Sequence, residues 1–309
     1  MVARHFMGRV MEEEYDIRCP ESHQFHRLSP HRMTGDYALG SRLSEALAND
    51  ELEVHYQPQF DAASGRGCGV EALARWTMDG EAISPADFSP VAERFGSICA
   101  VGSWVLQHAC RTVARWVDTA LPVITLSVNV SAHQINDEFT STIARILEAT
   151  GFEGRRLELE ITESALITNI ECVIDCLEQW RRQGVRIAID DFGTGYSSLQ
   201  YLSRLPLDRL KLDRAFVHRM LLDRKSAAVV RSIFSLGNDI GVTVLAEGIE
   251  SERQFEFLQG LGCQQVQGFL FAKPMTEHLA RALLAEPWGA RKQPTLCLER
   301  LQSRTLYAA

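Results

Sequence analysis

Residues 187–195 read IAIDDFGTG, a short apolar run that ends in two adjacent aspartates, Asp190 and Asp191, before a glycine-rich turn. A run of this kind, bounded by a turn, is typical of a buried strand. Two neighbouring carboxylates repel each other unless a cation lies between them. The stretch therefore predicts a buried strand and, at its end, a place for a cation.

Other apolar runs repeat this arrangement. Each ends at or near a residue with a side-chain oxygen: Glu71 in GVEALARW, Asn129 in LSVNVS, Glu160 in LELEITE and Glu247 in VTVLAEGIE. Parallel strands of a closed barrel end at one mouth, so we expect these oxygens to converge there, where they would suit a hard divalent cation. Strand alternation puts Glu158 on the same face as Glu160, so the residues alone leave open which of the two serves the mouth.

Beyond its first part, the chain alternates strands with helices, which predicts a mainly parallel sheet. Eight strands with apolar centres predict closure into a barrel. The expected strands are 52–60, 68–76, 123–130, 156–161, 185–190, 208–213, 242–247 and 265–271. The expected helices are 36–49, one that begins with Ser84 as N-cap and Pro85, 100–117, 138–150, 169–183, a short one after 196, 224–239, 251–260 and 276–286.

The first two expected strands depart from a regular barrel. The segment between 52–60 and 68–76 is short, rich in turn residues and without a helical pattern. A parallel pair would need a crossover of about a dozen residues or more. We therefore expect an antiparallel hairpin, and the predicted fold is α/β: a modified TIM-type (β/α)8 barrel with an antiparallel first strand.

Length and charge limit the functional classes. The chain has 309 residues, of which 46% are hydrophobic, and a barrel of eight βα units takes about 250 residues. We expect a polar tail or linker remnant over 1–35, a barrel over 36–287 and a C-terminal tail over 288–309. The formal net charge of −8 argues against binding of duplex nucleic acid.

Two further features concern the cell compartment. The chain contains eight cysteines and no CxxC motif, which predicts free thiols in a reducing cytoplasm. No apolar stretch reaches about 18 residues, so no membrane contact is expected from this chain itself. We expect a cytoplasmic protein, or the cytoplasmic part of a larger, membrane-tethered one.

Taken together, these stretches resemble a known family, the EAL domains of bacterial cyclic-di-GMP phosphodiesterases. The resemblance runs from about residue 38 to 287 and follows the order and spacing of the family's motifs. They are YQPQ (56–59), EALARW (71–76), SVNVS (127–131), ELEITES (158–164), IDDFGTGYSSL (189–199), LKLD (210–213), AEGIE (246–250) and QGFLFAKP (267–274). A chance EAL triplet alone would carry no weight.

The resemblance implies two divalent cations, Mg²⁺ or Mn²⁺, with Ca²⁺ as an inhibitor. By this likeness Glu71, Asn129, Glu160 and Asp190 are ligands of one cation. Asp190 and Asp191 link that cation to the second. Glu247 would hold the second cation, hold its water, or act as general base, and the sequence does not separate these roles.

Further site residues are also carried over from the family. The likeness makes Lys211 a contact of the attacking water or a phosphate, the alternative being a salt bridge to Asp213. Arg75 would contact a phosphate, the alternative being a surface ion pair. Gln57, Leu73 and Gln267 would lie against the substrate.

The loop DFGTGYSSL (191–199) has glycines on both sides of Thr194, which permits unusual backbone angles. In the family this loop couples Asp191 to a dimer interface, and Glu163 resembles the residue that anchors it. A homodimer is therefore expected.

The resemblance implies hydrolysis of one phosphodiester bond of cyclic di-GMP to linear pGpG, with two cations activating the water that attacks phosphorus in line. The complete set of acids favours this enzyme over a receptor that binds cyclic di-GMP without cleaving it. A metal phosphodiesterase of similar fold acting on another nucleotide is the third reading.

Overall fold

The computed structural model describes residues 39–43, 45–49, 51–116, 124–166, 170–193 and 199–285. Within these ranges nine strands form one sheet. They are β1 (Leu52–Asp61), β2 (Gly67–Met78), β3 (Glu81–Ile83), β4 (Thr125–Val130), β5 (Leu157–Thr162), β6 (Arg186–Phe192), β7 (Arg209–Leu212), β8 (Thr243–Ala246) and β9 (Gln265–Val266). Their order is β1-β9-β8-β7-β6-β5-β4-β2-β3, and pairing of β1 with β2 closes eight of them into a barrel.

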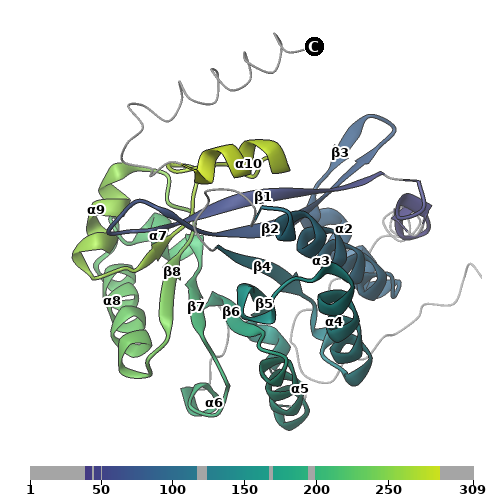
Figure 1. Ribbon diagram of the computed structural model, residues 1–309. Helices are drawn as coiled ribbons and strands as arrows, with labels where there is room; N and C mark the ends of the chain where they lie inside the picture. Colours follow the sequence, from purple (N-terminus) through teal and green to yellow (C-terminus); the bar gives the residue numbers. More distant parts are fainter. Residues whose placement is uncertain are drawn as a thin grey trace, which may run out of the picture. The chain divides into compact units, whose positions relative to one another are not determined.

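Helices surround this barrel (Figure 1). They are α2 (Pro85–Arg94), α3 (Ile98–Ala114), α4 (Asp137–Thr150), α5 (Ile170–Arg182), α6 (Leu199–Leu202), α7 (Arg214–Arg219), α8 (Arg224–Asp239), α9 (Glu252–Gly260) and α10 (Glu277–Leu284), with short 3₁₀ turns η1 (Ala132–Gln134), η2 (Gly154–Arg156) and η3 (Glu163–Leu166). The predicted helices are confirmed to within a few residues. Of the first one, 36–49, the described part is helical over 39–43 and 45–46.

The first strand runs against its neighbours. β1 pairs antiparallel with both β2 and β9, whereas the pairings from β2 through β4 to β9 are parallel. The turn between β1 and β2 is too short for a crossover, so the second strand must double back on the first. The predicted barrel with an antiparallel first strand is confirmed.

The β1–β2 hairpin continues beyond the part of β2 that belongs to the barrel. β2 pairs with β4 only from Gly69 to Ala72. Residues 73–78 of β2 pair instead with β1 and with β3, a short strand that the sequence pattern did not predict. The extension begins where β2 passes the C-terminal end of its pairing with β4, and we call the part of β2 over 73–76 with its β1 partners the hairpin wall.

The apolar core lies between the outer face of the barrel and the helices. Trp76, Trp116 and Trp180 are almost fully buried in it. Each indole N–H has an acceptor; that of Trp180, for example, donates to Thr140 Oγ1 over 2.8 Å. A buried polar group without a partner is costly, so these bonds let large aromatic side chains fill the core.

The expected strand over 265–271 is wrong beyond its second residue, since β9 ends at Val266. The chain turns at Gly268, where φ is 157° and the amides of Phe271 and Ala272 donate to the Gly268 carbonyl. A side chain at this position would collide with the backbone of Ile249. The close approach of two backbones ends the strand here.

Some expectations concern residues that the structure does not describe, namely the tails 1–35 and 288–309 and the residue Thr194. In the described part of the chain, six cysteines form no disulfide, which agrees with the expected thiols, and Cys99 and Cys172 are exposed. No helix in those same ranges is long and apolar enough to cross a membrane.

A substitution tests the turn at Gly268. We expect Gly268→Ala to lower the free energy of unfolding by about 2 kcal/mol, because it combines an unfavourable φ with a backbone collision. Gly260→Ala at the end of α9 is the matched control, since its added Cβ meets nothing within 4 Å. Equal stabilities of the two variants in urea unfolding would contradict this account of the turn.

Candidate active site

Acidic side chains meet around one lysine at the mouth of the barrel. The Lys211 ammonium on β7 lies 2.6 Å from Glu160 Oε2, 3.1 Å from Asp190 Oδ1, 2.7 Å from Glu247 Oε1 and 3.8 Å from Glu71 Oε1. These four acids come from different strands or their ends, and Lys211 itself is 1% exposed. The predicted convergence of carboxylates is therefore present in the structure.

The alternative partner for Lys211, Asp213, is excluded by these contacts. Asp213 instead caps α7, where its side chain accepts a hydrogen bond from the amide of Ala215. Lys211 thus belongs to the acidic cluster at the mouth and not to a surface ion pair.

Glu71 is held from two sides by amide groups. Asn129 Nδ2 donates to Glu71 Oε1 over 2.7 Å, and Gln267 Nε2 donates to Glu71 Oε2 over 2.6 Å. Gln267 Nε2 also donates to Gln57 Oε1, and Gln57 Nε2 donates to the carbonyl of Ala272. The amides of Gln57 and Gln267 are buried and bonded within the protein, which orients the Glu71 carboxylate.

The electrostatics of the cluster reflect more negative charge than one ammonium can balance. Burial raises the pKa of Glu160 well above its usual range, with Glu71 and Asp190 adding to the effect and Lys211 opposing it. Burial likewise raises the pKa of Glu247 to about 8. Burial alone would lower the pKa of Lys211, but the surrounding carboxylates outweigh it and raise that pKa.

The adjacent aspartates lie at a break in the strand ladder. β6 pairs with β7 at Ile189 and again at Phe192, so Asp190 and Asp191 together oppose the single residue Lys211. Such a bulge interrupts the alternation that would send neighbouring side chains to opposite faces. Asp191 has φ 54°, a strained backbone of the kind found at functional sites.

The Asp191 carboxylate also lies among other acids. Its burial, the charge of Asp190 and a hydrogen bond with Asp213 raise its pKa to about 6. The Asp191 amide donates to Asp190 Oδ1 over 2.9 Å. The bulge therefore brings a second crowded carboxylate to the cluster, which is the physical setting that attracts cations.

The residues of the mouth fit a hard divalent cation. In the described ranges no three acidic, histidine or cysteine side chains are arranged to hold a metal ion, and the ammonium of Lys211 stands among the acids. The donors are nevertheless carboxylate and amide oxygens, which suit Mg²⁺ or Mn²⁺. Glu160 Oε1 is buried without a hydrogen-bond partner, and a cation would satisfy it.

The hairpin wall carries the other predicted contacts. Cross-strand pairs place Gln57 opposite Glu71, His55 opposite Leu73 and Glu53 opposite Arg75. Arg75 is half-buried, and its Nη1 donates to the carbonyl of Ala74. His55 was not predicted as a site residue, although its two-residue spacing from Gln57 places it on the same face of β1.

Glu163 follows β5 in the sequence, and its side chain contacts the start of the loop after β6. It is buried, and its Oε2 accepts a hydrogen bond from the amide of Gly193 over 3.1 Å. This contact ties Gly193, the first residue after β6, to the end of β5. The role of Glu163 as anchor of the whole loop stays a prediction. Thr194, the other residue predicted for this loop, lies outside the described residues.

A second layer of polar residues lies inside the barrel below the mouth. Glu158 Oε1 lies 2.6 Å from Arg209 Nη1, with both side chains at most 1% exposed, and accepts a hydrogen bond from Ser127 Oγ. Arg209 Nη1 also donates to Gln59 Oε1. Of the two glutamates on this face of β5, the structure places Glu160 beside Lys211 in the acidic cluster and Glu158 beside Arg209.

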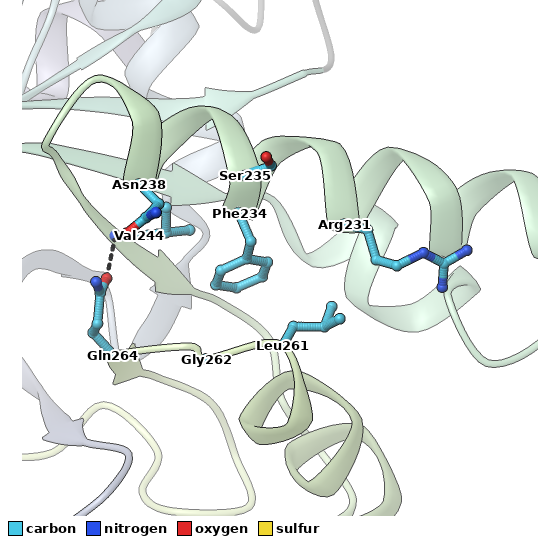
Figure 2. A pocket seen from close by; sticks show the side chains of 8 residues that line it. All are labelled: Arg231, Phe234, Ser235, Asn238, Val244, Leu261, Gly262 and Gln264. Carbon is cyan, nitrogen blue, oxygen red and sulfur yellow. Dashed lines mark hydrogen bonds between the residues drawn. The ribbon is translucent and has the colours of Figure 1, made fainter.

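A hollow of about 440 Å³ lies elsewhere, between α8 and the turn that precedes β9 (Figure 2). It is lined from α8 by Arg231, Phe234, Ser235 and Asn238. On the other side, Gln264 Oε1 accepts a hydrogen bond from the amide of Val244. None of the predicted site residues lines this hollow. The acidic mouth is therefore the better candidate for chemistry.

Comparison with known proteins agrees with this geometry. The family model described as the EAL domain matches residues 41–274, which is most of the chain. The chain belongs to the EAL domain family. Its Glu71-Ala72-Leu73 triplet lies on β2, with the acid of the cluster first and the wall residue Leu73 third.

Individual EAL relatives are similar over the same region. MucR of Pseudomonas aeruginosa, named a bifunctional diguanylate cyclase/cyclic di-GMP phosphodiesterase, is 42% identical over 235 residues, which is 75% of this chain and 34% of MucR. PdeR of Escherichia coli, named a cyclic di-GMP phosphodiesterase, is 39% identical over 255 residues, 82% of this chain and 38% of PdeR.

Solved structures show the same likeness. The PaMucR phosphodiesterase in complex with c-di-GMP superposes with a TM-score of 0.75 at 42% identity and covers 78% of this chain and 99% of that one. The EAL enzyme Bd1971, bound to cAMP and cyclic di-GMP, gives 0.77 at 32% identity, with 82% and 69% covered. The chain spans 29% to 34% of the length of the first four curated relatives it matches.

The central lysine generates a prediction about stability. Lys211→Met leaves the four acids without their internal cation, so we expect the free energy of unfolding in EDTA to fall by about 3 kcal/mol. Mn²⁺ should then raise the melting temperature of the variant more than that of the wild type, because it supplies the missing charge. Equal Mn²⁺ shifts in thermal unfolding of both proteins would contradict this role of Lys211.

Proposed function

We propose that this EAL domain hydrolyses one phosphodiester bond of cyclic di-GMP and releases linear pGpG. The observation that carries the proposal is the meeting of Glu71, Asn129, Glu160, Asp190 and Glu247 near Lys211 at the barrel mouth. Relatives of 39–42% identity are named cyclic di-GMP phosphodiesterases. Enzymes of this family are generally dependent on divalent metals, and the oxygen donors fit that requirement.

We assign the cation donors as follows. Glu71, Asn129, Glu160 and Asp190 would hold one divalent cation, and Asp190, Asp191 and Glu247 would hold the second, with Mg²⁺ or Mn²⁺ as the fitting metals. Bound there, the pair would lower the pKa of a water molecule and offset charge on the phosphoryl oxygens. The neutral amide of Asn129 limits the negative charge of the set.

The protein's own groups then act on the reacting phosphate. The Lys211 ammonium, which lies among the donors of the mouth, would stabilise the negative charge that grows on the phosphoryl oxygens in the transition state. Among the four acids around Lys211, Glu247 has the most exposed side chain, 18%. This exposure would let Glu247 contact the attacking water as well as the second cation.

The hairpin wall would bind and orient the substrate. Arg75 presents a planar guanidinium that matches two phosphate oxygens, and Leu73 offers an apolar surface beside it. Gln57 and Gln267 lie at the base of this wall, next to Glu71. Their predicted contact with the substrate stays a prediction. The anchor Glu163 would hold the loop that contains Thr194.

The assembly and location of the protein are further parts of the proposal. A homodimer formed near the 191–199 loop remains expected, and light scattering that gives a monomer mass at assay concentration would refute it. Free cysteines throughout the described ranges agree with a reducing compartment, so the cytoplasm stays the predicted location.

Turnover by a variant at the mouth tests the activity. With Mn²⁺ or Mg²⁺ the wild type should convert cyclic di-GMP to pGpG, as followed by chromatography, and EDTA or excess Ca²⁺ should stop the reaction. Glu71→Ala should lower the rate by roughly 10³-fold without unfolding the protein, because it removes a donor and little core. Glu81→Ala on the exposed edge strand β3 is the control and should leave the rate unchanged.

The assay also separates the alternatives. Tight binding of cyclic di-GMP with no pGpG from the metal-loaded wild type would favour a receptor. Turnover that other cyclic dinucleotides suppress equally well would favour a phosphodiesterase for another nucleotide.

A second substitution tests the pair of cations. Asp191→Asn should cut Mg²⁺-dependent turnover roughly 10²-fold, because an amide offers no charge to a second cation. Asparagine tolerates the positive φ of this position, so the backbone should keep its shape. Asp79→Asn at φ 52° in the β2–β3 turn is the matched control. Full activity of Asp191→Asn would rule out the two-cation assignment.

A further inference from the structure

A continuous chain of hydrogen bonds joins the lower polar layer of the barrel to Glu71. It starts at the buried ion pair of Glu158 and Arg209, passes from Arg209 to Gln59 Oε1 over 3.1 Å, and continues from Gln59 Nε2 to Gln267 Oε1 over 3.0 Å. Gln267 Nε2 completes it by donating to Glu71 Oε2. All of these side chains are buried, so water does not substitute for a missing link.

The chain has a fixed direction. A guanidinium has only donors, so Gln59 must turn its oxygen toward Arg209 and its NH₂ toward Gln267. Gln267 then presents its own oxygen to Gln59, and its NH₂ donates to both Glu71 Oε2 and Gln57 Oε1. If Gln59 were reversed, its oxygen would face the oxygen of Gln267, or, if Gln267 reversed too, a Gln267 oxygen would face the Glu71 carboxylate, and both contacts are repulsive.

The space for Gln59 is prepared by a neighbouring residue. A Cβ at Gly69 on β2 would lie 2.6 Å from Gln59 Oε1 and 3.1 Å from the Thr125 carbonyl. Glycine at this position therefore leaves room beside β2 for the Gln59 oxygen that accepts from Arg209. The arrangement is built into the barrel and does not depend on any surface contact.

We propose that Gln59, with the Glu158–Arg209 ion pair beneath it, is a positioning element that sets the orientation of Gln267 and hence of the Glu71 carboxylate toward the cations. This inference rests on the proposed function, because Glu71 serves as a cation donor there. Gln59, Glu158 and Arg209 touch neither the substrate nor the reacting atoms in this account. They act through Gln267.

Two substitutions of Gln59 distinguish positioning from packing. Gln59→Met keeps the volume and removes the link, so Mn²⁺ affinity, measured by electron paramagnetic resonance of free Mn²⁺, should fall about 10-fold. Gln59→Glu keeps the contact with Arg209 but has no NH₂, so its carboxylate repels the oxygen of Gln267 and displaces the amide that holds Glu71. Its Mn²⁺ affinity should fall further, by about 30-fold or more within the range for residues behind metal ligands.

This order is diagnostic, because glutamate resembles glutamine in shape more closely than methionine does, and yet Gln59→Glu is expected to lose more Mn²⁺ affinity than Gln59→Met. A role in packing alone predicts the reverse order. At saturating Mn²⁺ both variants should keep the wild-type KM for cyclic di-GMP within about threefold while the Mn²⁺ concentration for half-maximal activity rises with the lost affinity. Thr112→Val, which removes a buried hydroxyl on α3, is the control and should change none of these values.

A further variant covers the case in which the new charge of Gln59→Glu prevents folding. The double substitution Glu158→Leu with Arg209→Met replaces the ion pair by apolar groups, which buried pairs often tolerate. Gln59 stays in place but loses the cation that fixes its direction, so Mn²⁺ affinity should fall about 5-fold to 10-fold.

The outcomes are separable. Wild-type Mn²⁺ affinity, within twofold, in folded Gln59→Met and in the double variant would overturn the positioning role, even if all the proteins make pGpG. Conversely, a wild type that binds Mn²⁺ but makes no pGpG would refute the proposed activity, while the ordered loss of Mn²⁺ affinity would still support the positioning role.

Discussion

The structure of the mouth depends on one buried ammonium among four carboxylates. Lys211 lies within 4 Å of Glu71, Glu160, Asp190 and Glu247, and without it these acids would face one another in a place with little water. Removing a single partner from such a group leaves an uncompensated buried charge, which is costly. The lysine therefore allows the barrel to bring acids together before any cation arrives.

The amide groups next to this cluster have the complementary task. Asn129 and Gln267 hold the two oxygens of Glu71, and Gln59 connects Gln267 to the ion pair below. Charge in the mouth is thus set by acids and one lysine, whereas direction is set by amides, whose donor and acceptor ends differ. Both are needed, because a correctly charged carboxylate at the wrong angle is a poor donor to a small cation.

Much of this arrangement could be predicted from the sequence. Apolar runs that end in Glu71, Asn129, Glu160, Asp190 and Glu247 indicated strands and a common mouth, and the short link after 52–60 indicated the reversed first strand. The bulge at Asp190 and Asp191 could not be predicted, because strict alternation sends neighbouring side chains apart. The end of β9 could not be predicted either. The turn at Gly268 follows from the close approach of the Ile249 backbone, which is distant in the sequence. The pairing of Glu158 with Arg209 joins residues 51 positions apart, and no local pattern reveals it.

The hairpin wall has a consequence for the thermodynamics of ligand capture. Leu73 and Arg75 are on a ladder hydrogen-bonded to β1 and followed by β3, so their backbone is already ordered in the free protein. Ordering a loop on association costs conformational entropy, and a surface fixed by strand pairing avoids most of that loss. Under the proposed function, recognition of the substrate along this side should therefore resemble binding to a rigid surface, with fast association and little change in heat capacity beyond that from the apolar area covered.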